Sequence, residues 1–265
     1  MTRRIRLTIE YDGTAYSGWQ RQLNAISVQQ RLEEAVAKLT GEAVSLTGAS
    51  RTDAGVHALG QVAHFDTTSR IPGDKFAFAL NTMLPPDIRV SSSFETRPDF
   101  HARFDAKGKL YRYLIHNHPH ASALGRNTHA HAIYPLDEYL MHEEAQSLTG
   151  THDFAAFAAS GSIVKDTVRT VYEARVLRDG CEVELLIRGD GFLYNMVRII
   201  AGTLIAVGSG KLAPGAFKRA IKSGNRLDLG PTAPACGLTL MRVYYDDDPP
   251  EEAAQDGFPY DFLPY

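Results

Sequence analysis

The sequence predicts an α+β protein built from two ferredoxin-like (βαββαβ) halves, whose strands form one continuous, mainly antiparallel sheet with helices on one face. Two observations lead to this fold class. Segments with the alternating pattern of a strand and segments with the apolar spacing of a helix follow one another in the order strand, helix, strand, strand, helix, strand. That order then occurs a second time, with one extra helix. The repetition is one of pattern and not of sequence.

In the first half, Ile5, Leu7, Ile9 and Tyr11 alternate with polar residues, which predicts a half-buried strand. Ser27 and Gln30 form a capping box, and an apolar stripe from Val28 to Leu39 predicts a helix that stops at Gly41. The remaining elements expected here are strands over 44–46, 61–67 and 88–94 and a helix over 73–83 that Pro85-Pro86 ends.

The second half is interpreted in the same way. The expected elements are a strand over 111–115, a helix over 135–148, a hairpin of 168–177 and 182–188 around Asp179-Gly180, an apolar helix over 192–207, a shorter helix over 214–222 and a closing strand over 237–244. We therefore divide the chain into residues 1–105, residues 106–245 and an acidic tail, 246–265, that we expect to be flexible.

Composition is typical of a globular protein, with 44% hydrophobic and 22% charged residues in a chain of 265. The net charge is −3, but seven of the 31 acidic residues lie in the last twenty positions, where there is no Lys or Arg. The rest carries 28 basic and 24 acidic residues, a net +4, which is compatible with a local patch that binds a polyanion. Two cysteines, no signal-like segment and no apolar run near the roughly 20 residues of a membrane span favour a cytoplasmic location.

The stretch Gly48-Ala-Ser-Arg-Thr-Asp-Ala-Gly-Val-His-Ala58 places Arg51, Thr52 and Asp53 between two glycines, so Asp53 is expected on a turn. An aspartate in a turn commonly only bonds to nearby backbone amides. Arg51 favours a second interpretation, because a guanidinium and a carboxylate on one tight loop can bind a phosphodiester and do chemistry beside it.

Arg198 interrupts an otherwise apolar helix, where a charge is costly unless it is paired. It either reaches the surface or meets a buried carboxylate; beside Asp53 it would lower the pKa of that carboxyl by about 1 to 3 units.

Tyr111 is a strand residue that either fills the core or stacks on a base, with its hydroxyl near the site from which the C5 proton is removed. Phe100, His101, Arg103 and Phe104, followed by Lys107, Lys109 and Arg112, interleave rings with cations, as a surface that stacks bases and neutralises phosphates requires. Lys165 and Arg169 are a second basic pair, which is either solvated surface or part of the same RNA-binding surface.

Alternating histidines, His116, His118 and His120 with His129 and His131, make a metal site geometrically possible, but no acidic or cysteine ligand stands among them. No dinucleotide-binding or phosphate-binding glycine-rich loop is present. We therefore expect no metal and no cofactor.

The Asp53 stretch resembles the active-site motif of the tRNA pseudouridine synthase A (TruA) family, in which a glycine commonly stands at the place of Ser50. Further matches are Tyr11-Asp12-Gly13, Gly18-Trp19-Gln20, residues 100–113 and 191–210, and Gly237-Leu238. The resemblance implies two halves related by a pseudo-twofold with a central catalytic cleft, a homodimer, and isomerisation of uridine to pseudouridine in the anticodon stem-loop of tRNA, at positions thirty-eight to forty.

The resemblance also implies roles for single residues. Asp53 would be the nucleophile, Arg198 would face it, Tyr111 would contact the target nucleotide and residues 101–104 would touch RNA. The reaction requires the nucleotide to be flipped out, and Arg51 is suited to fill the vacated space. Attack of Asp53 on the ribose C1′, attack on the uracil C6 and removal of a ribose proton are all compatible with the sequence. Two other classes stay open: a non-catalytic RNA-binding module and a metal-dependent hydrolase that uses the histidines.

Overall fold

The computed structural model describes residues 1–158 and 166–248. Its strands and α-helices, in chain order, are β1 (Arg3–Tyr11), α1 (Val28–Thr40), β2 (Thr47–Gly48), β3 (His57–Thr67), α2 (Phe76–Asn81), β4 (Ile88–Thr96), β5 (Gly108–Asn117), β6 (Ala130–Ala132), α3 (Glu138–Gln146), β7 (Gly150–Asp153), β8 (Val168–Asp179), β9 (Glu182–Gly189), α4 (Met196–Gly208), α5 (Ala216–Ser223) and β10 (Leu238–Tyr244). Short 3-10 turns lie at 13–15, 73–75, 155–157, 226–228 and 235–237.

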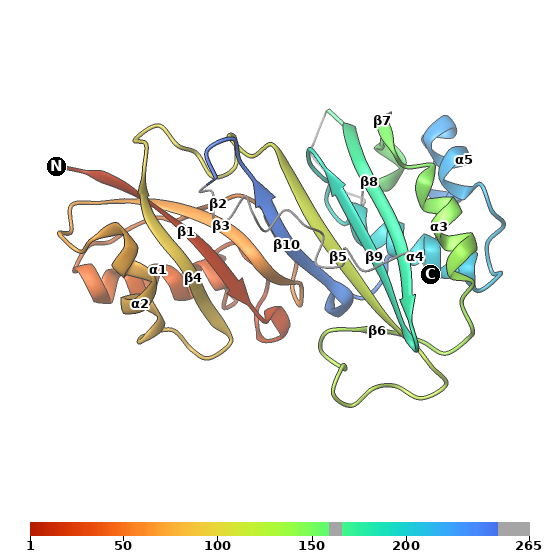
Figure 1. Ribbon diagram of the computed structural model, residues 1–265, viewed down its shortest axis with the longest axis horizontal. Helices are drawn as coiled ribbons and strands as arrows, with labels where there is room; N and C mark the ends of the chain where they lie inside the picture. Colours follow the sequence, from red (N-terminus) through yellow and green to blue (C-terminus); the bar gives the residue numbers. More distant parts are fainter. Residues whose placement is uncertain (159–165, 249–265) are drawn as a thin grey trace.

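The described strands form one sheet in the order β4-β1-β3-β10-β5-β9-β8-β7, with β2 added beside β3 and β6 beside β5 (Figure 1). Neighbouring strands are antiparallel except in two places, where β6 runs parallel to β5 and β10 runs parallel to β3. The β3–β10 contact joins the halves, because β3 belongs to the first half and β10 to the second, and it places His57 opposite Thr239. The predicted fold class, two βαββαβ halves in a continuous sheet, is confirmed.

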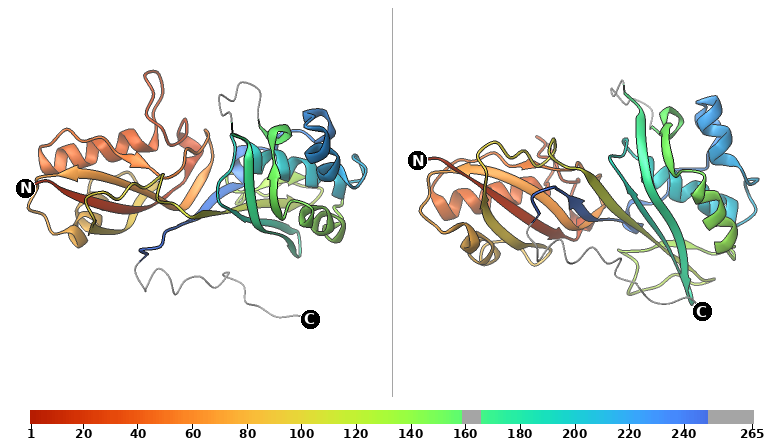
Figure 2. Two further views of the ribbon diagram at one scale, coloured as in Figure 1. Left: turned by 90° about the horizontal axis from the view of Figure 1, so that it is seen from above. Right: turned by 45° about the horizontal axis from the view of Figure 1, so that its top comes forward.

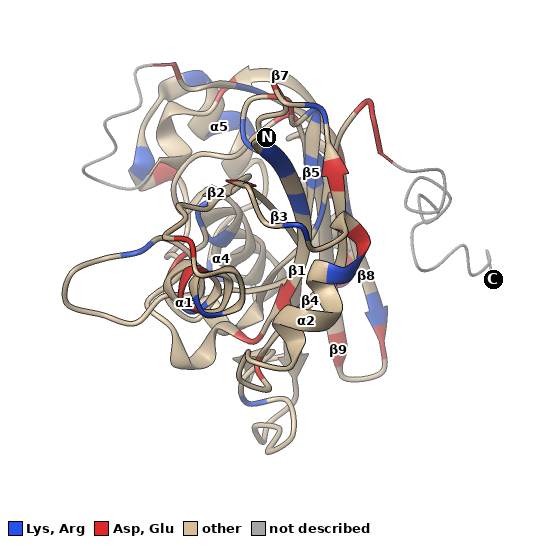
Figure 3. Cartoon of the chain, turned by 90° about the vertical axis from the view of Figure 1, so that its left-hand side faces the viewer, with Lys and Arg blue, Asp and Glu red and all other residues tan. Residues whose placement is uncertain are grey.

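The helices cover one face of the sheet because its two faces differ in polarity. Ile5, Leu7 and Ile9 point to one face and have no exposed surface. In Figure 3, α1 and α4 lie on the same side of the strands, and Figure 2 shows this layer from two further directions. Arg6 points to the opposite face, where its guanidinium lies over the rings of Phe100 and Tyr245.

Local signals in the sequence set several element ends. The Ser27 side chain accepts a hydrogen bond from the Gln30 amide, and Gly41 closes α1 in the left-handed conformation, both as predicted. The hairpin of β8 and β9 around Asp179-Gly180 is likewise confirmed.

Three local predictions were wrong, and two short strands were not predicted. The strand expected over 44–46 is replaced by the two-residue β2, and β3 begins at His57 instead of residue 61. The apolar run from 192 becomes helical only at Met196, because Asn195 has a left-handed backbone, with a φ of 61°, that a right-handed helix does not continue through. The strands β6 and β7 were not predicted, since each is very short and pairs with a distant strand.

The described start of the acidic tail is paired with the body of the protein. Asp246 contacts Lys107, Asp247 contacts Arg97, and Asp248 lies 2.5 Å from Arg6. In Figure 3 these acids form the red stretch just before the grey trace. Residues 249–265, for which flexibility was predicted, lie outside the described residues.

Gly202 of α4 allows a close approach that the fold requires. A methyl group added there would collide with the carbonyl oxygen of Pro231, in the segment that continues to Ala233. We expect Gly202→Ala to lower the free energy of unfolding by about 3 kcal/mol, since backbone atoms have to move. Chemical denaturation measures this change.

Gly208→Ala, on the same helix, is the matched control. Its added methyl would meet the side-chain sulfur of Met141, which can move more easily than a backbone carbonyl. Equal losses of stability in the two variants would contradict the packing role of Gly202.

Candidate active site

A cavity of about 630 Å³ opens at the junction of the two halves. Its lining comes from the loop between β2 and β3, the turn before β5, β5 itself, the start of β8 and the segment that leads into α4. Among the predicted site residues the cavity collects Arg51, Asp53, His101, Arg103, Phe104, Tyr111 and Arg169. The cavity thus brings together side chains that are far apart in the sequence.

Asp53 and Arg198 form an ion pair across the junction. The Arg198 Nη1 lies 3.1 Å from the Asp53 Oδ2, and the side chains are only 22% and 19% exposed for Asp53 and Arg198. Of the two alternatives for Arg198, the geometry shows pairing with a carboxylate, here the partly buried Asp53.

Arg198 is held in place by two further acceptors. Its Nε donates to the carbonyl oxygen of Ala233 at 2.9 Å, and Nη1 also donates to the side-chain oxygen of Asn195 at 2.9 Å. Asn195 precedes α4 with a φ of 61°, a left-handed conformation that a non-glycine residue seldom adopts. Three acceptors orient the guanidinium, so it presents a fixed charge to Asp53.

The predicted direction of the Asp53 pKa shift was wrong. Burial raises the pKa of Asp53 above its ordinary value, and the hydrogen bond and charge of Arg198 lower it by less than burial raises it. The sequence showed the arginine but not how far the carboxyl group is withdrawn from water. Arg198 therefore limits the rise in pKa and helps to keep the carboxylate ionised.

The loop that carries Asp53 is tied to buried residues on several sides. Gln61, with no exposed surface, accepts from the Ser50 amide at 3.2 Å and donates to the Ser50 carbonyl at 2.7 Å. The Thr52 hydroxyl bonds to the Tyr11 hydroxyl at 2.7 Å, and the Thr52 carbonyl accepts from the Trp19 amide at 3.1 Å. These bonds leave the loop little freedom.

Ser50, the departure from the family motif, adopts an ordinary backbone conformation, since Asn195 alone among the described non-glycine residues has a positive φ. Its hydroxyl lies 2.9 Å from the hydroxyl of Tyr111. Tyr111 is 6% exposed and meets the ring of Phe192 edge-on at 5.3 Å. Burial raises the pKa of Tyr111 to about 12, despite the hydrogen bond between its hydroxyl and that of Ser50, so the phenol is protonated at neutral pH.

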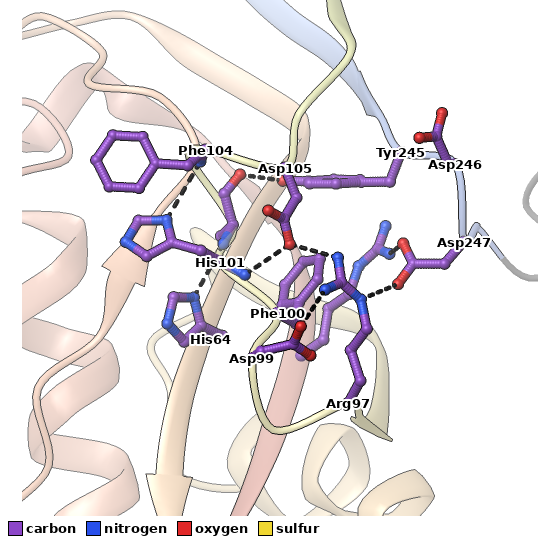
Figure 4. A network of polar contacts seen from close by, with 12 residues as sticks. His64, Arg97, Asp99, Phe100, His101, Phe104, Asp105, Tyr245, Asp246 and Asp247 are labelled. Atoms are coloured by element: carbon purple, nitrogen blue, oxygen red, sulfur yellow. Dashed lines mark hydrogen bonds and ion pairs between the residues drawn. The ribbon is translucent and has the colours of Figure 1, made fainter.

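The turn before β5 presents one ring to the cavity and buries another. Phe104 is 75% exposed, and its ring stacks on that of His101 with the centroids 4.2 Å apart (Figure 4). His101 Nδ1 accepts from the amides of Arg103 and Phe104, each at 3.2 Å. The turn therefore holds the stacked pair in one orientation.

Phe100 requires a correction. Its ring has no exposed surface and packs between His64, Tyr245 and Arg6, so it is not available to contact RNA. The alternation of rings and cations did not show which ring faces inward. Phe100 instead supports the turn, whose Arg97 binds Asp99, Asp105 and Asp247 (Figure 4).

Arg51 is exposed at the rim of the cavity, and Arg169 enters it from β8. Lys165 lies outside the described residues. Gln61 and Asn195 are site residues that the sequence did not single out, and Asn195 lines the cavity. A polar residue within an apolar strand was the one available signal for Gln61. Lys109, which the sequence placed among the cations of the expected RNA-binding surface, also lines the cavity.

The histidines of the alternating run lie close together, and His116 and His129 both bond to Glu182, at 2.7 and 3.0 Å. Within residues 1–158 and 166–248, no group of three or more His, Cys, Asp or Glu side chains is arranged to hold a metal ion. In the same residues, none of the helices is both long and apolar enough to cross a bilayer.

The family model described as tRNA pseudouridine synthase matches residues 7–105 and 145–246 of this chain. These ranges contain Asp53 and Arg198 and cover both halves. The chain belongs to the tRNA pseudouridine synthase family. It is therefore a member of a family of tRNA-modifying isomerases, as the sequence motifs predicted.

Individual members of the tRNA pseudouridine synthase family are similar over almost the whole chain. The tRNA pseudouridine synthase A of Ruminiclostridium cellulolyticum is 53% identical over 92% of this chain and 100% of its own length. The tRNA pseudouridine synthase A of Acetivibrio thermocellus is 54% identical, again over 92% of this chain and 100% of its own length. Among solved structures, a Cbf5-Nop10-Gar1 complex matches with 13% identity and a TM-score of 0.39, over 91% of this chain and 50% of that chain.

The Asp53–Arg198 pair makes a prediction about pH. On the hypothesis that Asp53 attacks the substrate or acts as a base, only its ionised form is active, and its pKa is raised by burial. We then expect pseudouridine formation to decline on the acid side at a higher pH than an ordinary carboxyl group would cause. Arg198→Met removes the charge that lowers this pKa, so the decline should move to still higher pH. Single-turnover rates across a pH series measure the shift.

Arg198→Lys, which keeps a positive charge, is the matched variant and should shift the profile less. An unchanged acid limb in Arg198→Met would contradict the electrostatic role of Arg198.

Proposed function

We propose that this protein isomerises uridine to pseudouridine in the anticodon stem-loop of tRNA, with Asp53 as the residue that attacks the flipped-out nucleotide. The observation that carries this proposal is the ion pair with Arg198 of Asp53, which lines a cavity together with rings and cations. A carboxylate that is partly buried, oriented and paired meets the requirements of a nucleophile. The names of the similar proteins supply tRNA as the substrate.

The cavity suits a nucleotide that has left its helix. A stacked base is out of reach of an enzyme side chain, so the target must turn outward at a cost of a few kcal/mol. The exposed Arg51 at the rim is placed to enter the vacated space and to contact the backbone. The stacked pair of Phe104 and His101 offers a flat surface to an unpaired base.

Tyr111 acts on the uracil ring by contact. Its side chain lines the same cavity as Asp53, and its orientation is set by the Ser50 hydroxyl and the Phe192 ring. A phenol with a pKa of about 12 does not remove a proton directly at neutral pH. We therefore assign Tyr111 to positioning the base, in preference to removal of the C5 proton.

In the proposed reaction the bond between N1 and the ribose breaks, the uracil turns, and C5 joins the ribose. The proton on C5 leaves and N1 takes up a proton, so the product is an isomer of uridine. Attack of Asp53 on C1′, attack on C6 and removal of a ribose proton all begin with an ionised Asp53. Arg198 serves each route equally, because it stabilises the carboxylate and not one intermediate. A homodimer and a cytoplasmic location remain predictions from the resemblance and the sequence.

Release of tritium from tRNA labelled at uracil C5, in buffer with EDTA, tests this function. We expect the intact protein to release tritium and Asp53→Asn to be slower by at least about a thousandfold, as for loss of a nucleophile in other enzymes. Affinity for tRNA should stay within about threefold, because Asn keeps the shape of the side chain.

The exposed Asp74 supplies the control, and Asp74→Asn should release tritium at the rate of the intact protein. If Asp53→Asn still released tritium, Asp53 would not be the attacking residue. Binding without release by the intact protein would favour an RNA-binding module, and activity lost only in EDTA would favour a metal enzyme.

A further inference from the structure

One wall of the cavity carries three basic side chains from three separate segments. Arg103 lies in the turn before β5, Lys109 lies on β5, and Arg169 lies on β8. Lys109 is two residues before Tyr111, so both side chains project from the same face of the strand. The wall therefore adjoins the position proposed for the base.

The three charges act on one another. Burial lowers the pKa of Lys109 to about 8, and the positive charges of Arg103 and Arg169 act in the same direction. Two like charges that perturb a third must lie near it. The residues paired with Lys109 on the neighbouring strands, Gly189 and Val243, carry no charge that could offset it.

Within the described parts of the chain, no ion pair joins Arg103, Lys109 or Arg169 to a carboxylate. Arg169 donates instead to the main-chain oxygens of Asp166 and Val168. Asp53, the acid in the same cavity, is bound by Arg198. Lys109 and Arg169 are partly buried, whereas Arg103 is exposed. Like charges held near one another without a counterion cost free energy, which an anionic ligand would recover.

We propose that Arg103, Lys109 and Arg169 form a binding subsite for a phosphodiester of the RNA backbone beside the nucleotide that is isomerised. This proposal rests on the proposed function, since the ligand is the RNA substrate. A phosphodiester fits because it is a monoanion with several acceptor oxygens, and arginine and lysine both bind it. Lys109 belongs to the set because it lies on the same strand as Tyr111 and its charge is close to those of both arginines.

Lys109→Met tests the subsite, because it removes the charge and keeps most of the side-chain volume. The measurement is the affinity for a fluorescently labelled stem-loop RNA carrying the target uridine, at several salt concentrations. At roughly 0.1 M salt we expect affinity to fall about tenfold. The slope of log K against log salt should become shallower by about 0.7 to 0.9, because the variant neutralises one phosphate fewer.

Two variants serve as controls. Lys109→Arg keeps the charge and should bind within about threefold of the intact protein. Lys218→Met removes an exposed charge on α5, which is not part of the cavity lining, and should leave affinity and slope unchanged. The unfolding temperature of Lys109→Met should equal or exceed that of the intact protein, since an unpaired, partly buried cation is replaced by an apolar group.

Unchanged affinity and slope in Lys109→Met would overturn the subsite, and so would an equal effect of Lys218→Met. Tritium release by the intact protein separates this result from the proposed function. If the intact protein releases tritium and Lys109→Met binds RNA normally, the subsite alone is refuted. If the intact protein releases no tritium, the proposed function is refuted, and the salt slope of Lys109→Met still shows whether Lys109 contacts a phosphate.

Discussion

The ion pair between Asp53 and Arg198 is the interaction on which the arrangement of this site depends. One charge comes from the first half and the other from the second, and each is largely withdrawn from water. Either charge without the other would be an uncompensated charge in a poorly solvated place. The two halves must therefore dock in one way, and the parallel contact of β3 with β10 holds that docking beside the loop of Asp53.

Both partners of the pair are held by groups that take no part in the pair itself. Gln61 and Tyr11 hold the loop of Asp53 through Ser50 and Thr52, while Ala233 and Asn195 hold the guanidinium of Arg198. A carboxylate whose orientation is already fixed loses little conformational entropy when the substrate binds. The strained backbone of Asn195 is consistent with such a role, because strain of this kind persists where surrounding contacts enforce it.

Charge is distributed unevenly over the molecule. On the face of the sheet that carries Arg6, the acids at 246–248 pair with Arg6, Arg97 and Lys107. In the cavity, Arg103, Lys109 and Arg169 have no such partners within the described residues, although the chain as a whole is slightly acidic. A net charge of −3 therefore does not conflict with an RNA substrate, because local and not total charge acts on a bound phosphate.

The sequence by itself determined the features that depend on neighbours along the chain. The cap at Ser27, the stop at Gly41, the β8–β9 hairpin and the turn at Asp53 follow from local backbone chemistry, and the double order of elements set the fold class. Tertiary structure decided the features that depend on contacts between distant segments of the chain. Burial made Phe100 a supporting ring and raised the pKa of Asp53, and the meeting of three segments placed Lys109 near two arginines. Solvent exclusion and charge proximity are properties of the packed chain, so no local pattern contains them.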